Sequence, residues 1–487
     1  MKINTTLLSC ICILSCSPAH TPSAEMVDGV SELPVENDEA PSPTVGKKRP
    51  AEPELRAVDL TWYEQAEILC DRATLAESFT KMGYKPMAGS YLVAARVLEG
   101  GDQPAFEYYS LGDTAFAHSD GRFWPASTIK LMAAVGALST LSKYGLNGDA
   151  YIDLTDARSR YRGSVAGLYQ NAIIHSNNLA YDRLVMIAGF DELNDSLLTP
   201  ENGFPTMTLQ CPYYPGVEEP SLRTSPSIIY KQRKLEGEIP ARHSNREHNE
   251  CPGDANCTTL FELLDGLRRV MLHDELPIKD RFPLHKKDVK RLHAHLLEAK
   301  NKLEPGVSKA LGHPVRVYNK AGRVPGADQN DHALVVDEVT GARYLVALSV
   351  PDTLRSDEKT QEKVMELASN ALKVLAGQAG TGVLLRRDGG LPIKLEIAPS
   401  SSEKGTYSIT ALLDGEVDKL ILWRNRDILT ETDGGAIETK STIPKEGHDL
   451  LVVQAERNGK VIGYRTLAVT LVADSLLSSV RDSRRAP

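Results

Sequence analysis

The chain has 487 residues, which is too long for one compact domain and predicts two or more. Hydrophobic residues make up 41% of the sequence, enough to build folded cores. The formal net charge of −9 and the isoelectric point near 5.8 disfavour a nucleic acid as partner.

The N-terminus is built like an export signal. An apolar stretch runs from Leu7 to Leu14, and Ser15 precedes Cys16. An apolar pair and a small residue before a cysteine resemble a bacterial lipoprotein signal, in which the cysteine is lipidated. We therefore expect residues 1–16 to be the signal and Cys16 to anchor the protein on the periplasmic face of a bacterial cell envelope. An ordinary cleaved signal peptide is the alternative, and it also implies export.

Residues 17–56 are rich in proline, serine, glutamate and alanine and have no apolar periodicity. This composition predicts a disordered linker. We expect folded sequence from about residue 57. Two strand-like runs then follow, Tyr91–Leu98 and Ala105–Leu111, with turn-like residues between them, and they predict a β-hairpin.

The segment Ser127-Thr128-Ile129-Lys130 opens a helix that is apolar nearly all round, which predicts a buried helix. Residues three apart on a helix share a face, so the amine of Lys130 can reach the hydroxyl of Ser127. A serine hydroxyl is a weak nucleophile until a base takes its proton, and a lysine is a base only when burial or a second cation destabilises its ammonium form. The same S-x-x-K spacing also begins at three other serines, so the spacing alone does not identify catalytic residues. The buried context is what favours a catalytic role for Ser127 and Lys130.

The segment Ser176-Asn177-Asn178 lies 49 residues after Ser127. Taken alone, it is most simply a helix-capping turn. Its position after the predicted nucleophile favours a functional interpretation instead.

Four cysteines follow the signal, three of them in a long segment between Met207 and Thr258. An even number in an oxidising compartment predicts two disulfides, most simply Cys251 with Cys257 and Cys70 with Cys211. Two histidines precede Cys251, so a zinc site is the alternative. Their spacing fits no standard zinc pattern, and we expect no metal.

Lys320-Ala321-Gly322 ends an alternating, strand-like stretch that begins at Val315. Two further strands are predicted after it, and an amphipathic helix from Asp357 to Leu375 closes this part of the chain. Beyond a small-residue linker, residues 378–475 alternate with period two in several short runs separated by turn signals. They predict a small β-sandwich, immunoglobulin-like, that serves binding or stability, and residues 476–487 form a tail.

Together, the three segments resemble the S-x-x-K, S-x-N and K-[TS]-G elements of serine β-lactamases and penicillin-binding proteins, in the same order. Residues 57–377 resemble the class A β-lactamase fold. The resemblance implies an α/β domain with an antiparallel sheet flanked by helices and an all-helical subdomain, followed here by the all-β domain.

The resemblance also assigns roles to the second and third segments. Ser176 would relay a proton to the leaving nitrogen, and Asn178 would hold the substrate amide. Lys320 would attract a substrate carboxylate, Gly322 would let the substrate backbone come close, and the N–H of Arg323 would be the second oxyanion donor. The family has Thr or Ser after the lysine, where this chain has alanine, so carboxylate binding is expected to be weaker.

A deacylating base is expected on the family's Ω-loop, in the pattern Glu-x-x-Leu-Asn. The chain offers Glu219, followed by Leu222 and by Arg223 in place of the asparagine. A cation so placed would lower the pKa of Glu219 and weaken it as a base. The alternative is a solvated acidic loop without a catalytic role.

The resemblance implies a serine hydrolase that opens β-lactam amides through an acyl-enzyme on Ser127, without a cofactor. A D-alanyl-D-alanine peptidase or penicillin-binding protein is the main alternative, and a glutaminase is a weaker one. A non-catalytic envelope lipoprotein scaffold is the alternative from another class. The expected partners are a small-molecule β-lactam or a peptidoglycan peptide, and the membrane through the N-terminal lipid.

Overall fold

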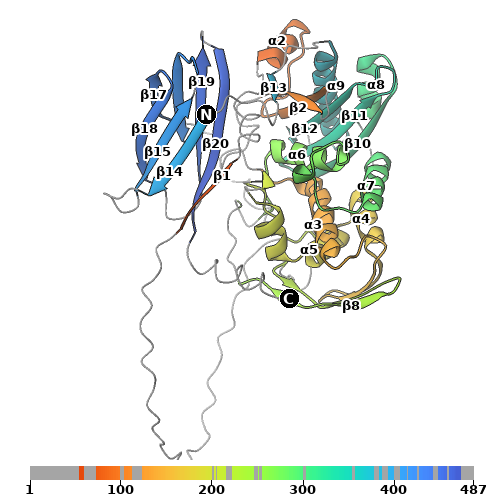
Figure 1. The fold of residues 1–487 in the computed structure, drawn as a ribbon. Coiled ribbons are helices and arrows are strands. Elements are labelled where there is room, and N and C mark those ends of the chain that lie inside the picture. The colour runs from red at the N-terminus through yellow and green to blue at the C-terminus, as the bar shows by residue number, and fades with distance from the viewer. Residues whose placement is uncertain are drawn as a thin grey trace, which may run out of the picture.

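The computed structural model describes residues 54–59, 73–98, 104–111, 123–199, 202–204, 206–214, 222–245, 251, 255–299, 303–353, 357–377, 383–385, 393–399, 406–413, 415–424, 427–442, 448–457 and 460–472. Two antiparallel sheets at the C-terminal end accompany a larger α/β part (Figure 1). Among the described residues, no helix is long and apolar enough to cross a membrane.

A six-stranded antiparallel sheet forms the centre of the α/β part. Its strands, in spatial order, are β10 (Val315–Val324), β11 (Asp328–Asp337), β12 (Arg343–Pro351), β2 (Tyr91–Leu98), β3 (Ala105–Leu111) and β13 (Val383–Leu385). The predicted hairpin of β2 and β3 is present. The strand β10, which carries Lys320 and Gly322, lies at the edge of the sheet.

Both faces of this sheet are buried, as the alternation along β2 shows. Val93 and Ala95 belong to one hydrophobic cluster, whereas Leu92 and Ala94 belong to another on the opposite face. The helices α2 (Ala73–Lys81), α8 (Glu304–Leu311) and α9 (Asp357–Gly377) cover the second face, and α6 (Leu260–Met271) packs on the first.

A mainly helical subdomain adjoins the first face (Figure 1). Its helices are α3 (Lys130–Lys143), α4 (Val165–Ile174), α5 (Asn178–Ala188) and α7 (Lys286–Glu298). The predicted burial of α3 is confirmed, because every residue from Lys130 to Leu141 is buried. Consequently α3 is held on all sides, and its N-terminal end is fixed in place.

The segment between Met207 and Thr258 adds a small sheet to this subdomain. The hairpin of β7 (Ile228–Gln232) and β8 (Leu235–Ile239) pairs with β4 (Tyr151–Thr155), which also pairs with β5 (Arg160–Ser164). Two short strands, β6 (Thr224–Ser225) and β9 (Arg242–His243), pair beside it.

The disulfide between Cys251 and Cys257 is present, with Cα atoms 5.4 Å apart. Cys251 is therefore not a thiolate ligand, which removes the alternative of a zinc site there. Cys211 is disulfide-bonded as well. Its expected partner, Cys70, lies outside the described residues.

The C-terminal strands form two antiparallel sheets around one hydrophobic cluster that includes Ile409, Leu422 and Val453. One sheet contains β14 (Ile393–Pro399), β15 (Thr406–Leu413) and β18 (Ala436–Thr442). The other contains β1 (Glu54–Asp59), β20 (Lys460–Val472), β19 (His448–Arg457), β16 (Lys419–Arg424) and β17 (Asp427–Asp433). The predicted all-β character of this region is confirmed.

The strand β1 differs from expectation. We predicted a linker up to residue 56 and the start of the α/β domain at 57, but residues 54–59 pair with β20, Glu54 opposite Val472 and Asp59 opposite Leu467. Likewise, β13 lies beyond the predicted boundary at 377 and pairs with β3 of the central sheet. Short strands of this kind depend on partners that are distant in sequence, so their own composition does not reveal them.

Candidate active site

Ser127 lies in a 3₁₀ turn, Ala126–Ile129, that leads directly into α3. Ala126 has a left-handed backbone with φ of +49°, which is unusual for a residue with a Cβ atom and persists only where the surroundings hold it. Two hydrogen bonds hold it here: the Thr128 hydroxyl donates to the Pro125 carbonyl at 2.6 Å, and the Tyr213 hydroxyl donates to the Ala126 carbonyl at 2.8 Å. The nucleophile turn is therefore a fixed feature.

The three predicted segments meet around the hydroxyl of Ser176. The Nζ of Lys130 donates to the carbonyl of Ser176 at 2.5 Å and to Oδ1 of Asn178 at 2.6 Å, and it lies 3.3 Å from the Ser176 hydroxyl. The Nζ of Lys320 donates to that same hydroxyl at 3.0 Å. Ser176 thus lies between two amines, one from α3 and one from β10.

Both lysines are buried, and this changes their acid–base behaviour. Burial, together with the nearby charge of Lys320, lowers the pKa of Lys130 to about 7, while Asp182 opposes the shift. Burial lowers the pKa of Lys320 to about 8, opposed by Asp331. A large fraction of Lys130 is therefore neutral near pH 7 and able to accept a proton.

The contact expected between Lys130 and Ser127 is not a hydrogen bond here. Within the described part of the chain, the Ser127 hydroxyl has no hydrogen-bond partner, and the Lys130 amine is bound by Ser176 and Asn178 instead. Catalytic hydrogen bonds are often loose before substrate binds. The role of Lys130 as base for Ser127 stays a prediction.

Asn178 is oriented by both ends of its amide. Its Oδ1 accepts from Lys130, and its Nδ2 donates to the carbonyl of Tyr213 at 2.9 Å. The amide nitrogen carries two hydrogens, so one remains for a substrate carbonyl. The side chain is exposed, which agrees with the predicted role in holding a substrate amide.

Gly322 is needed for a packing reason that the sequence did not reveal. A Cβ atom at this position would lie 2.8 Å from the Pro125 carbonyl and 2.8 Å from the backbone nitrogens of Ser127 and Thr128. The edge strand therefore packs directly against the backbone of the nucleophile turn. The glycine permits this contact within the protein, and its expected role in letting the substrate backbone come close stays a prediction.

We predict that Gly322→Ala displaces this turn. The substitution should destabilise the protein by about 1–3 kcal/mol, as overpacking does, and should slow acylation of Ser127. Thermal unfolding and the rate of labelling by a penicillin measure the two effects. Gly377→Ala is the matched control, because a Cβ atom there meets nothing within 4 Å. A Gly322→Ala protein with wild-type stability and rate would disprove the steric argument.

Sequence reasoning missed Tyr213. Its ring centroid lies 5.7 Å from Nζ of Lys130, and its hydroxyl accepts from Nε1 of Trp124 at 3.2 Å. Burial raises the pKa of Tyr213, so the phenol stays protonated and can donate to Ala126. Only a proline and a second tyrosine beside it marked this position in the sequence, and neither indicates an active site.

Asp182 was missed as well, and it positions Tyr213. Its buried carboxylate accepts from the backbone N–H of Tyr213 at 2.8 Å and of Tyr214 at 3.1 Å, and it pairs with Arg158. Burial raises the pKa of Asp182, while these hydrogen bonds oppose the rise. The segment with Tyr213 is thereby anchored to α5.

Residues 96–375 of the chain match the model of the β-lactamase enzyme family. The chain belongs to this family. No curated protein sequence matches it significantly. Among solved structures, the penicillin G acyl-enzyme of a PBP-A mutant is 15% identical with a TM-score of 0.42, covering 63% of this chain and 97% of that one. A β-lactamase from Burkholderia vietnamiensis is 19% identical with a TM-score of 0.41, and the match covers 63% of this chain and 97% of that one.

The family match runs from β2 to α9, so it includes the three predicted segments and most of the central sheet. The match confirms the predicted relation to the β-lactamase family. The described helices and strands confirm the predicted α/β fold class. The described residues contain no cluster of side chains suited to a metal ion.

Arg323 and Glu219 are two further residues that the sequence predicts for this β-lactamase-family site. The guanidinium of Arg323 pairs with Asp352, Nε to Oδ2 at 2.9 Å, which fixes the end of β10 beside the nucleophile turn. The role of its backbone N–H as an oxyanion donor stays a prediction. Glu219 lies outside the described residues, as does Cys16.

Proposed function

We propose that the protein is a serine hydrolase that opens β-lactam amides through an acyl-enzyme on Ser127. The observation that carries this proposal is the buried amine of Lys130, which has a pKa of about 7 and is held by Ser176 and Asn178 at the start of the nucleophile helix. Membership of the β-lactamase family supports the hydrolase class.

In the proposed mechanism, the neutral amine of Lys130 takes the proton of Ser127 as Oγ attacks the carbonyl carbon. The negative oxygen is stabilised by the backbone N–H groups of Ser127 and Arg323. When the C–N bond breaks, Ser176 passes a proton to the leaving nitrogen and regains one from a neighbouring amine. Its hydroxyl is within 3.3 Å of Lys130 and 3.0 Å of Lys320, which suits that relay.

A D-alanyl-D-alanine peptidase or penicillin-binding protein is the second candidate, and Tyr213 favours it. The space beside Lys130 and Asn178 contains an aromatic ring and its backbone carbonyl. Among the described residues, no carboxylate makes a hydrogen bond to Lys130. An aromatic ring cannot activate a water molecule, so an acyl-enzyme formed beside Tyr213 should lose its acyl group slowly.

We therefore predict a burst on nitrocefin, followed by a low steady rate. Acylation uses the residues of the three segments, whereas hydrolysis also needs a base to activate water. Stopped-flow absorbance measures both phases. Glu219→Gln should lower the steady rate further if Glu219 is that base. Rapid steady hydrolysis that is unchanged in Glu219→Gln would contradict both the slow turnover and the assignment of the base.

The experiment that tests the proposed function is the intact mass of the protein after incubation with benzylpenicillin. A covalent adduct of one ligand per chain supports the acyl-enzyme, and nitrocefin hydrolysis then separates a β-lactamase from a peptidase. No adduct would leave the non-catalytic envelope scaffold as the better account.

We also propose that the protein is anchored in the bacterial cell envelope by lipid on Cys16, which the sequence Ile13-Leu14-Ser15-Cys16 supports. Metabolic labelling with palmitate should mark the wild-type protein and not Cys16→Ser. Substitution of Ser17 by alanine, next to the same site, is the control and should keep the label. Equal labelling of wild type and Cys16→Ser would remove the anchor from the account.

A further inference from the structure

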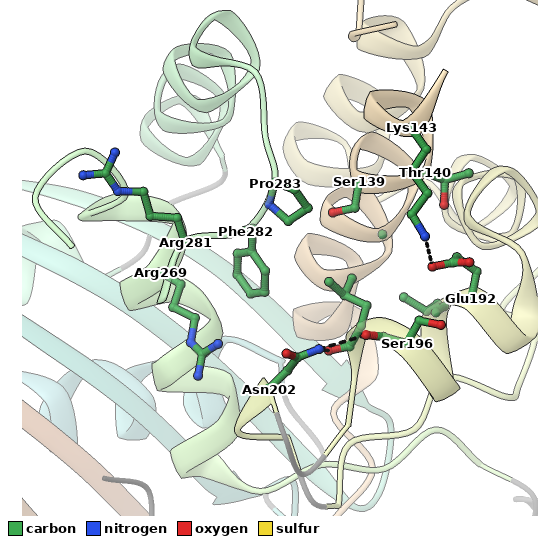
Figure 2. A pocket seen from close by; sticks show the side chains of 13 residues that line it. Ser139, Thr140, Lys143, Glu192, Ser196, Asn202, Arg269, Arg281, Phe282 and Pro283 are labelled. Atoms are coloured by element: carbon green, nitrogen blue, oxygen red, sulfur yellow. Dashed lines mark hydrogen bonds and ion pairs between the residues drawn. The ribbon is translucent and has the colours of Figure 1, made fainter. Parts of the chain in front are cut away.

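A cavity of about 260 Å³ lies against the C-terminal half of α3 (Figure 2). Its other walls are the π-helix Glu192–Leu197 and the segment 281–283. Ser139, on its wall, is nine residues beyond Lys130, which places it about 13 Å along the helix from the catalytic amine. The cavity contains none of the active-site residues described above.

The walls are mostly apolar, with Leu193, Leu197, Phe282 and Pro283 among them. A π-helix is rare and often marks a functional site. Lys143 and Glu192 form an ion pair at one side, so each neutralises the other (Figure 2). Arg269 also lies at the cavity wall, and it carries the charge that a ligand could pair with.

Arg269 is only 7% exposed, yet its hydrogen bonds are incomplete. Its Nε donates to Oδ2 of Asp265 at 2.7 Å, and Arg268 donates to Oδ1 of the same carboxylate at 2.7 Å. Within the described part of the chain, neither terminal nitrogen of Arg269 has a hydrogen-bond partner. The guanidinium lies 4.9 Å from the ring of Phe204 and 5.8 Å from that of Phe282.

Ser139 supplies a second unused donor. The residue is 6% exposed, and its hydroxyl is buried without a hydrogen-bond partner among the described residues. Buried polar groups are rarely left unpaired, because each one costs about 1–3 kcal/mol. At the cavity wall, Ser139 has a buried hydroxyl without a partner, and Arg269 has terminal N–H groups without a partner among the described residues. A ligand that brings a hydrogen-bond acceptor into the cavity would supply the missing partner.

We propose that this cavity binds a small monocarboxylate with an apolar body, whose carboxylate pairs with the guanidinium of Arg269. A guanidinium presents its terminal N–H groups in a fork that matches a carboxylate. The apolar body then contacts Phe282, Leu193 and Leu197, and Ser139 donates a further hydrogen bond. The cavity volume limits the ligand to roughly the size of an arylalkanoic acid.

Isothermal titration calorimetry with benzoate, phenylacetate and 3-phenylpropanoate tests the proposal on the full chain. At least one acid should bind saturably, and its uncharged amide should bind about tenfold or more weakly, the effect of one charge-assisted hydrogen bond. No saturable binding of the three acids at up to about 10 mM, or equal binding of acid and amide, would overturn the proposal.

Paired variants locate the site. Arg269→Gln should weaken binding of the acid to the level of its amide, because it removes the guanidinium that pairs with the carboxylate. Arg281→Gln should leave binding unchanged, because Arg281 lies at the cavity wall but donates to the carbonyls of Leu276 and Asp274. Ser139→Leu should fill the cavity and block binding, whereas Ser142→Leu on the same helix should not. Thermal unfolding confirms that each variant is folded. If Arg269→Gln does not fold, the binding measurement on Ser139→Leu tests the location of the site instead. Unchanged binding in folded Ser139→Leu overturns the assignment.

Discussion

Replacing Ser127 by alanine is expected to abolish covalent labelling by a penicillin. The hydroxyl oxygen is the atom that forms the ester, and alanine has no atom to replace it. The substitution removes one partly buried oxygen without a partner in the described part of the chain, so the fold should be unaffected. Gel fluorescence with a labelled penicillin measures the loss.

Ser142→Ala is the matched control, because it removes a serine hydroxyl from α3, the helix that follows the Ser127 turn, away from the site. It should label at the wild-type rate. Label that persists on Ser127→Ala would place the nucleophile elsewhere and contradict the assignment of the three segments.

The second large effect is expected for Lys130→Met. Methionine keeps the unbranched shape of the buried side chain but cannot accept a proton, so the acylation rate should fall by about 10²–10⁴, the usual contribution of a general base. The same labelling assay, followed over time, measures the rate. A Lys130→Met protein that labels as fast as wild type would show that another group activates Ser127.

The same substitution should stabilise the protein at low pH. Burial lowers the pKa of Lys130 from 10.5 to about 7, so the unfolded chain binds the proton more strongly than the folded one between these values. The contribution of Lys130 to the free energy of unfolding therefore rises with pH between about 7 and 10.5. Below pH 7, the buried ammonium of Lys130 destabilises the folded protein most. Lys130→Met removes this destabilisation, and chemical unfolding at pH 6 and pH 10 should show the larger gain at pH 6.

The sequence predicted the elements that carry the site because their signals are local. The apolar run after Ser127 indicates a buried helix by itself, and α3 is buried along twelve consecutive residues. The order of the three segments then indicated the family, and Lys130, Ser176, Asn178 and Lys320 do meet.

The features that sequence reasoning missed depend on distant contacts. Tyr213 approaches Lys130 through distant contacts, among them the hydrogen bond from its backbone N–H to Asp182, 31 residues earlier. The strand β1 exists through pairing with β20, more than 400 residues away along the chain. The need for glycine at 322 comes from the backbone of Ser127, which no pattern near Gly322 reveals.

The central claim is that the neutral amine of Lys130 activates Ser127, and the pH dependence of the acylation rate constant tests it most directly. The free amine is the active form, so the rate should rise with pH through about 7 and level off above it. Lys130→Met should lack this rise. A wild-type rate that stays constant between about pH 5 and pH 9, or that falls as pH rises through 7, would contradict a lysine base at this site.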